Sequence, residues 1–216
     1  GKQGAGLMPL RGQNNVQGAC DMGMLPYYAP DYQTPKEIGL MTPQLVDEML
    51  EGRIKAVINM GEDLTHIHPN SNKVNRALDN VEFVMVQELF MTEIANRADI
   101  VIGIKSAYEK TGVYVNAMRR LHLSQPLVTS DLPDDWEVIK LLDNKMGGTY
   151  AYEDSKQIWD EVRSLCPNFY GATYEKMDGV GYAQWPIPTE EGNGTPTMYL
   201  GGKFNTPDHK AILMAH

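Results

Sequence analysis

The chain has 216 residues, of which 42% are hydrophobic and 22% charged, a composition typical of a globular protein. Its formal net charge of -9 and its lack of a basic cluster argue against nucleic-acid binding, and no apolar run reaches the ~20 residues of a membrane span. Two cysteines are too few for a disulfide framework, a four-cysteine zinc site or an iron–sulfur cluster held by this chain alone, and they suit a reducing, cytoplasmic compartment.

The first 42 residues are rich in Gly, Asn, Gln and Pro and show no helical or strand period, which predicts loops and irregular structure. The densest run of polar side chains in this segment extends from Arg11 to Gly23. An arginine offers a planar fork of donors suited to a carboxylate, and a nearby glutamine adds a directed hydrogen bond. The residues alone leave open whether this run is a binding loop or a solvated turn.

Residues 43–148 alternate between helical and strand patterns. Thr42 followed by Pro43 predicts the start of a helix, with Thr42 as its N-cap. Short apolar runs predict three buried strands at 56–60, 83–86 and 100–102, separated by stretches with helical spacing. This order predicts a parallel, Rossmann-like sheet of βαβ units, and the fold class is α/β with extended, irregular N- and C-terminal segments.

Polar residues follow two of these strands at their carboxyl ends, the edge at which parallel α/β sheets bind ligands. Gly61, Glu62 and Asp63 come directly after the first strand, and Gln87 lies at the end of the second. No Gly-x-Gly-x-x-Gly pattern follows, so the usual dinucleotide fingerprint is absent. Plain turns between strand and helix are the alternative interpretation of both sites.

No metal site is predicted within the chain. His66 and His68 could share a metal, but no third ligand lies near them in the sequence. No Ser–His–Asp or Cys–His arrangement is recognisable either.

Residues 149–216 predict one further helix, roughly 155–165, with Ile158, Trp159, Val162 and Leu165 on its apolar face. The remainder of this segment is aromatic and rich in Pro and Gly, which is typical of an extended arm that wraps around a domain.

A series of ordered motifs carries a family resemblance. They are LRGQNNVQGACDMG at 10–23, GED at 61–63, VQELFMT at 86–92, ADIV at 98–101, DWEVI at 135–139 and QWP at 184–186. In these motifs the chain resembles the catalytic (alpha) subunit of molybdenum- or tungsten-dependent formate dehydrogenases, within the molybdopterin oxidoreductase superfamily.

The resemblance implies an oxidoreductase that interconverts formate and carbon dioxide. It implies a bis-molybdopterin guanine dinucleotide carrying Mo or W, and a 4Fe-4S cluster bound outside this segment. The implied partners are formate or carbon dioxide, the remaining parts of the catalytic subunit, and iron–sulfur electron-transfer subunits.

The resemblance also implies site residues and a division of the chain. Arg11 and Gln13 take catalytic positions beside the metal and the bound formate. The implied cofactor-binding residues are Gly61, Glu62, Asp63, Gln87, Thr92 and Asp135. Residues 1–42 are then an active-site-type loop segment, 43–148 a molybdopterin-dinucleotide-binding-like domain, and 149–216 a helix with a wrapping segment.

The resemblance covers a middle third of a longer subunit. The four-cysteine cluster segment, the Cys or selenocysteine that ligates the metal, and the C-terminal cofactor domain lie outside it. The alternative is a non-catalytic structural or interaction remnant of a molybdopterin oxidoreductase that lacks the metal site. Whether the isolated chain is itself an enzyme stays open.

Overall fold

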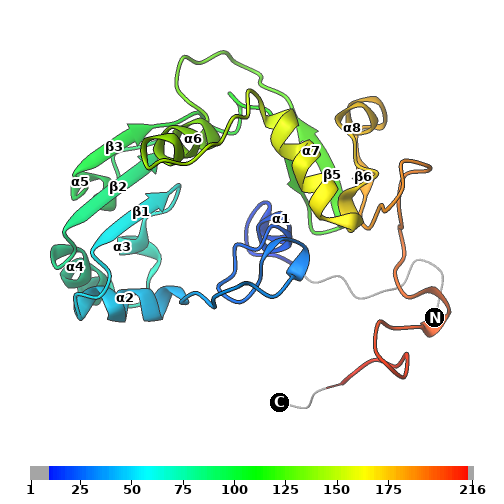
Figure 1. The fold of residues 1–216 in the computed structure, drawn as a ribbon, viewed down its shortest axis with the longest axis horizontal. Helices are drawn as coiled ribbons and strands as arrows, with labels where there is room; N and C mark the ends of the chain where they lie inside the picture. Colours follow the sequence, from blue (N-terminus) through cyan, green and yellow to red (C-terminus); the bar gives the residue numbers. More distant parts are fainter. Residues whose placement is uncertain (1–9, 214–216) are drawn as a thin grey trace.

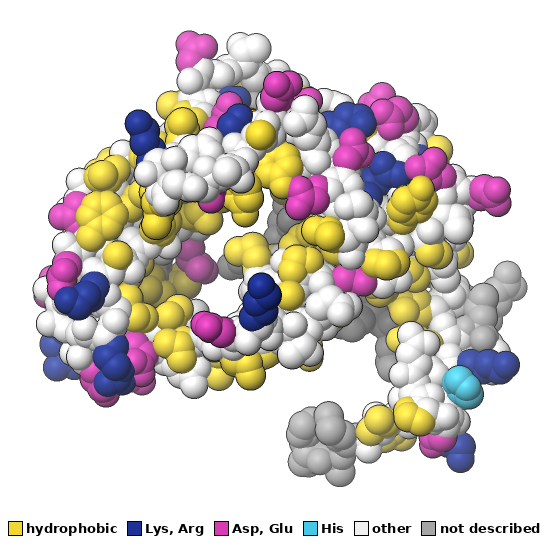
Figure 2. Space-filling model, in the orientation of Figure 1, with side chains coloured by type: hydrophobic (Ala, Val, Ile, Leu, Met, Phe, Trp, Pro, Cys, Tyr) yellow, Lys and Arg dark blue, Asp and Glu magenta, His cyan; other side chains and the backbone are white. Residues whose placement is uncertain are grey.

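A computed structural model describes residues 10–213 of the chain. Figure 1 shows two halves around a central hollow, joined at the top of the view and again below the hollow by the segment between α1 and α2, with a parallel sheet on one side and a small antiparallel sheet on the other. Figure 2 shows the molecular surface hollowed at the same place. No helix in the described part is long and apolar enough to cross a bilayer.

The parallel sheet confirms the predicted fold class. Its strands β1 (Ala56–Met60), β2 (Phe83–Glu88) and β3 (Ile100–Gly103) lie in the order β1-β2-β3, and both pairs are parallel. Five helices accompany them: α2 (Thr42–Leu50), α3 (Leu64–Ile67), α4 (Ser71–Asp79), α5 (Glu93–Asn96) and α6 (Asp135–Lys145). The alternation follows from the three apolar runs, because β2 is buried on both faces and supplies the centre of the sheet.

The two faces of this sheet differ in how well they are covered. On one face, side chains from α2, α4 and α5 pack on β2 in a core that includes Val46, Val74, Val86 and Ile94, all fully buried. Burying each such side chain stabilises the fold by roughly 1.5–3 kcal/mol. On the other face the core is small, and α6 contributes only Val138 to it. Ile139 and Leu141 of the same helix are exposed.

Helix starts agree with the sequence to within a residue. Asn70 and Thr92 cap α4 and α5 through side-chain oxygens that accept the N–H groups of Lys73 and Ala95. Thr42, expected as an N-cap, is instead the first residue of α2, because Gln44 Oε1 accepts the Met41 N–H at 2.9 Å and fixes the start one residue earlier.

The other half holds a second, antiparallel sheet. Its strands are β4 (Gly112–Val115), β5 (Arg120–Ser124) and β6 (Ala183–Gln184). Helices α7 (Ser155–Leu165) and α8 (Tyr174–Val180) accompany this sheet. Trp159 anchors the shared core: its indole Nε1 donates to Ala172 O at 2.6 Å and its ring meets Phe169 edge-on.

The N-terminal segment contains two short helical turns, so the expectation of purely irregular structure over 1–42 is wrong for part of it. These are α1 (Val16–Asp21) and a 3-10 turn, η1 (Pro30–Tyr32). The helix is held by a distant contact, since Asn15 Oδ1 accepts the Val115 N–H of β4 at 2.9 Å. Tertiary contacts thus supply order that local periodicity did not predict. The first nine residues of this segment lie outside the described range.

Candidate functional site

The residues predicted to bind a cofactor come from three consecutive strand ends. We call Gly61, Glu62, Asp63, Gln87, Thr92 and Asp135 the strand-end group. Gly61 donates its N–H to Gln87 O at 2.9 Å, which joins the ends of β1 and β2. Asp63 Oδ2 accepts the N–H of Glu93, the residue after Thr92, at 3.2 Å. Parallel strands place their carboxyl ends at one edge, so the structure gathers these five residues there.

The sixth member of the group, Asp135, lies at the start of α6. The segment after β3 reaches this helix start, because Lys105 donates its N–H to Pro133 O at 3.0 Å and its Nζ lies 3.3 Å from Asp134 Oδ2. Asp135 itself pairs with Lys110. The third strand end therefore carries two lysines and two carboxylates, and Asp134 keeps one buried oxygen, Oδ1, without a hydrogen-bond partner among the described residues.

Asp63 forms the N-cap of α3. Its Oδ1 accepts from the N–H and the hydroxyl of Thr65, and its Oδ2 accepts from His66 Nδ1 at 2.7 Å as well as from Glu93. Burial alone would raise the pKa of this carboxyl, but the donated hydrogen bonds outweigh it and hold the pKa below its usual range. Each oxygen of Asp63 already accepts two hydrogen bonds, so the side chain orders the turn after β1.

Gln87 is the most deeply buried member of the strand-end group, at 1% exposure. Its Nε2 approaches Met60 Sδ at 3.1 Å, while its Oε1 is buried without a donor among the described residues. An unpaired buried acceptor of this kind costs about 1–3 kcal/mol. Next to it Gly61 adopts a left-handed φ of 63°, and a side chain there would meet open space. The edge thus offers an unused acceptor beside room for a ligand.

Arg11 and Gln13 lie in the other half of the molecule, in the loop before α1, and both are exposed. No hydrogen bond joins them to the strand-end group within residues 10–213. In Figure 1, α1 lies across the central hollow from the tip of β1. Arg11 donates from Nη2 to Gln17 Oε1 at 2.6 Å, the one hydrogen bond of its guanidinium in the described range. The rest of its donor fork is available to an anion.

Behind Arg11 lies a polar network whose members were not assigned a role from the sequence. Gln17 Nε2 donates to Asp21 Oδ1 at 2.8 Å, and Tyr32 Oη donates to the same oxygen at 2.9 Å. Asp21 is 1% exposed, and its Oδ2 has no partner in the described structure. Burial raises the pKa of Asp21, against the hydrogen bonds from Gln17 and Tyr32. The i, i+4 spacing of Gln17 and Asp21 was the one sequence signal for this pair.

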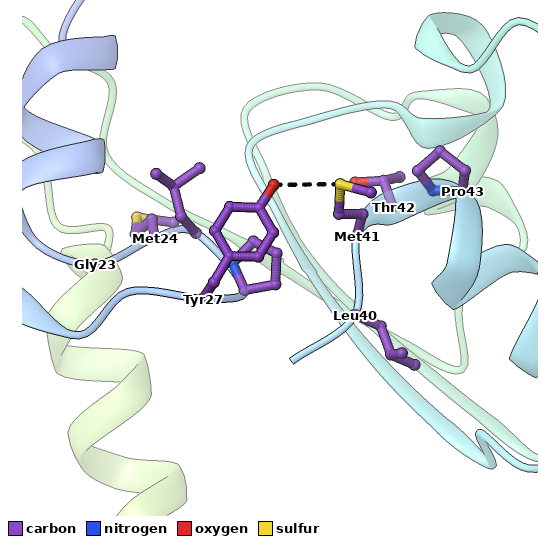
Figure 3. Close-up of a pocket in the computed structure, with 9 residues that line it drawn as sticks. Gly23, Met24, Tyr27, Leu40, Met41, Thr42 and Pro43 are labelled. Atoms are coloured by element: carbon purple, nitrogen blue, oxygen red, sulfur yellow. Dashed lines mark hydrogen bonds between the residues drawn. The ribbon is translucent and has the colours of Figure 1, made fainter. Parts of the chain in front are cut away.

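An open cleft lies elsewhere in the described structure. It measures about 560 Å³, is lined by residues 23–27 and 40–43, and is spanned by a hydrogen bond from Tyr27 Oη to Met41 Sδ at 3.3 Å (Figure 3). None of the predicted site residues lines it.

No group of three or more His, Cys, Asp or Glu residues arranged to hold a metal occurs in the part of the chain that the structure describes. His66 is bound to Asp63, and this contact raises the pKa of the imidazole.

The chain is also similar in sequence to known proteins. The family model described as molybdopterin oxidoreductase matches residues 1–145. The chain is 38% identical to formate dehydrogenase H of Escherichia coli (strain K12), over 96% of this chain and 32% of that protein. It is 36% identical to the F420-dependent formate dehydrogenase subunit alpha of Methanocaldococcus jannaschii, over 99% of this chain and 34% of that protein. The chain therefore spans about a third of the length of these relatives.

Among solved structures, acetylene hydratase from Pelobacter acetylenicus resembles this fold, with a TM-score of 0.57 over 77% of this chain and 24% of that one. Its sequence identity is 19%, so the likeness concerns the fold alone.

Proposed function

The chain belongs to the molybdopterin oxidoreductase family, and on that premise we propose that it is a segment of a formate dehydrogenase catalytic subunit. The relatives with that name match nearly the whole chain. The complete subunit would oxidise formate to carbon dioxide, reversibly, at a molybdopterin-bound Mo or W centre.

The observation that carries this proposal is the state of Arg11. Its guanidinium is exposed and is anchored through one nitrogen to Gln17, and within residues 10–213 the rest of its planar fork has no hydrogen-bond partner. A carboxylate matches that fork in charge and geometry, and one charge-assisted hydrogen bond is worth about 1.5–3 kcal/mol. We assign Arg11 to the binding of the formate carboxylate, with Gln13, two residues further along the same exposed loop, as a second donor.

The strand-end group suits a pterin nucleotide. Gln87 Oε1 is an unused buried acceptor, and the pterin and guanine rings both carry N–H donors. Thr92, Glu62 and Asp135 add oxygen acceptors, and Gly61 leaves space for close approach. Both oxygens of Asp63 already accept hydrogen bonds from Thr65, His66 and Glu93, so Asp63 orders the turn after β1. When bound, the pterin-held metal would accept the two electrons released from formate, while the protein supplies position and electrostatics.

We propose further that the partners are the rest of the catalytic subunit and iron–sulfur electron-transfer subunits, and that the complex is cytoplasmic. A guanine dinucleotide form of the cofactor and a 4Fe-4S cluster outside this segment belong to the same proposal. The two cysteines are free thiols, in keeping with a reducing compartment.

The test is to express the complete subunit that contains this chain and to measure formate oxidation with an artificial electron acceptor, together with metal and pterin content. Formate-dependent turnover proportional to bound Mo or W supports the proposal. A metal- and pterin-loaded subunit that does not oxidise formate contradicts it, and a subunit that binds neither supports the non-catalytic remnant instead.

A further inference from the structure

We propose that Gln17 is a positioning residue for Arg11, and that Asp21 and Tyr32 determine which way its amide points. This inference rests on the proposed role of Arg11 in binding formate. The four residues Arg11, Gln17, Asp21 and Tyr32 are called the Arg11 network below.

Both ends of the Gln17 amide are engaged. Its Oε1 accepts from Arg11 Nη2 at 2.6 Å, while its Nε2 donates to Asp21 Oδ1 at 2.8 Å and to Tyr32 Oη at 3.2 Å. Within residues 10–213, the amide is therefore the one hydrogen-bonded link between the exposed guanidinium and the buried carboxyl.

The donors and acceptors around Gln17 determine the orientation of its side-chain amide. The two ends of an amide are alike in shape but opposite in hydrogen bonding, one accepting and the other donating. Asp21 Oδ1 accepts the hydroxyl of Tyr32: in the ionised form both oxygens accept, and in the neutral form Oδ2, which has no partner among the described residues, can carry the proton. Only the Nε2 end of Gln17 can face Asp21, so Oε1 must face Arg11. The reversed amide would bring donors against donors and acceptors against acceptors.

Tyr32 reinforces the same direction. Its hydroxyl donates to Asp21 Oδ1 at 2.9 Å, which leaves the phenol oxygen free to accept from Gln17 Nε2. Burial and the neighbouring Asp21 raise the pKa of Tyr32 to about 12, so the phenol remains a donor at neutral pH. Asp21 is 1% exposed, and water competes little for its contacts.

Three segments of the chain meet in this network. Gln17 and Asp21 lie one turn apart on α1, Tyr32 ends η1, and Arg11 lies in the loop before α1. The turn at Tyr32 is itself tied to the other half of the sequence, since Asn168 Nδ2 donates to Asp31 Oδ1 at 3.1 Å. The network therefore transmits the order of the folded core to a loop arginine that would otherwise sample many rotamers, which is the preorganisation that substrate binding requires.

The test uses side-chain NMR of the complete subunit that contains this chain, with ¹⁵N-labelled arginine, and it needs no bound cofactor. Arg11→Lys identifies the Arg11 signals by their loss. We expect resolved Nη–H signals for Arg11 in the native chain and averaged signals in Gln17→Met, which removes both the acceptor for Arg11 and the donor to Asp21. Unchanged Arg11 signals in Gln17→Met would overturn the proposal.

A second, gentler pair of variants keeps the test decisive if Gln17→Met does not fold. Tyr32→Phe removes one hydroxyl from the network, and Tyr27→Phe removes a hydroxyl that donates to Met41 instead. These tyrosines are similarly exposed, at 41% and 44%. Faster Arg11 Nη rotation in Tyr32→Phe alone supports the proposal, and equal rotation in both variants contradicts it.

Kinetics of the complete subunit separate positioning from a merely structural role. Gln17→Met should raise KM for formate by about tenfold while kcat per bound metal stays within about twofold. An unchanged KM in an active enzyme contradicts the inference. A native subunit that does not oxidise formate defeats the proposed function instead, and the NMR result on the Arg11 network then stands by itself.

Discussion

The two halves of the molecule each contain a largely buried aspartate, and the two carboxylates differ in how many hydrogen bonds they accept. Asp63, at the end of β1, has a side chain that is 12% exposed and accepts four hydrogen bonds, two on each oxygen. Asp21, in α1, is more deeply buried but accepts only two from the described residues, both on Oδ1. Their pKa values move in opposite directions, down for Asp63 and up for Asp21.

The difference distinguishes a structural carboxyl from one that serves a site. Asp63 begins a helix and stabilises the fold in its ionised form, as N-cap residues do. Asp21 is poorly satisfied, yet it accepts a hydrogen bond from Gln17, the side chain that anchors Arg11. Natural proteins accept such local costs mainly where function requires them. Substitutions in the two halves of the molecule can test this difference between Asp63 and Asp21.

Arg11→Lys in the complete enzyme should lower kcat/KM for formate by about 10- to 150-fold, the equivalent of roughly 1.5–3 kcal/mol. Lysine keeps the charge but loses the planar fork that can hold a carboxylate at two points. Turnover is measured per bound metal, so that lost cofactor is not mistaken for lost chemistry.

The matched control for that variant is Arg53→Lys. Arg53 is exposed just after α2 and pairs with Glu48 and Glu51, far along the sequence from the Arg11 loop. Its replacement should change kcat/KM by no more than the equivalent of about 0.5 kcal/mol. Metal-normalised turnover in Arg11→Lys equal to that of Arg53→Lys would remove Arg11 from substrate binding.

Asp63→Ala should lower the free energy of unfolding by about 1 kcal/mol, because α3 loses its N-cap. The folded-state pKa of Asp63 lies below the ordinary value near 4, so its contribution is complete above about pH 4 and is lost as pH falls through the folded-state pKa. Chemical denaturation at several pH values should show the deficit shrinking in acid. A deficit as large in acid as at neutral pH, or none beyond that of the exposed Asp178→Ala, contradicts the cap assignment.

Asp21→Asn should have the smallest effect, a gain of up to about 0.5 kcal/mol at neutral pH. The folded-state pKa of Asp21 is raised, so the ionised carboxyl opposes folding at neutral pH and this cost fades as pH falls towards 4. Asparagine keeps an acceptor for Gln17 and Tyr32 without the charge. Thermal unfolding of the variant beside Asp178→Asn measures the change. A loss of several degrees at neutral pH would show that the charge of Asp21 stabilises the fold.

The sequence predicted the parallel sheet because its signal is local. Each of the runs at 56–60, 83–86 and 100–102 is apolar and short, and the stretches between them have helical spacing. The antiparallel sheet was largely missed because β6 has two residues and pairs with β5 across some 60 positions, as in Leu121 with Ala183. Helix α1 was missed for the same reason, since Asn15 is tied to Val115.

Some features of the candidate site could likewise be predicted from the sequence, and others depend on the fold. The strand-end positions of Gly61 and Gln87 follow from the rule that parallel strands present their carboxyl ends together. The duty of Asp63 as a cap, and the meeting of Gln17 with Tyr32, depend on side-chain geometry that only the fold supplies.

The central claim, that Arg11 faces the formate carboxylate, is tested most directly by protection from an arginine-selective dicarbonyl reagent. The complete, metal-loaded subunit is treated with and without formate at constant ionic strength, and peptide mass spectrometry measures modification at each arginine. Formate should slow modification of Arg11, with half-protection near its KM, while the exposed Arg76 reacts at an unchanged rate. Equal modification of Arg11 with and without saturating formate would contradict the account.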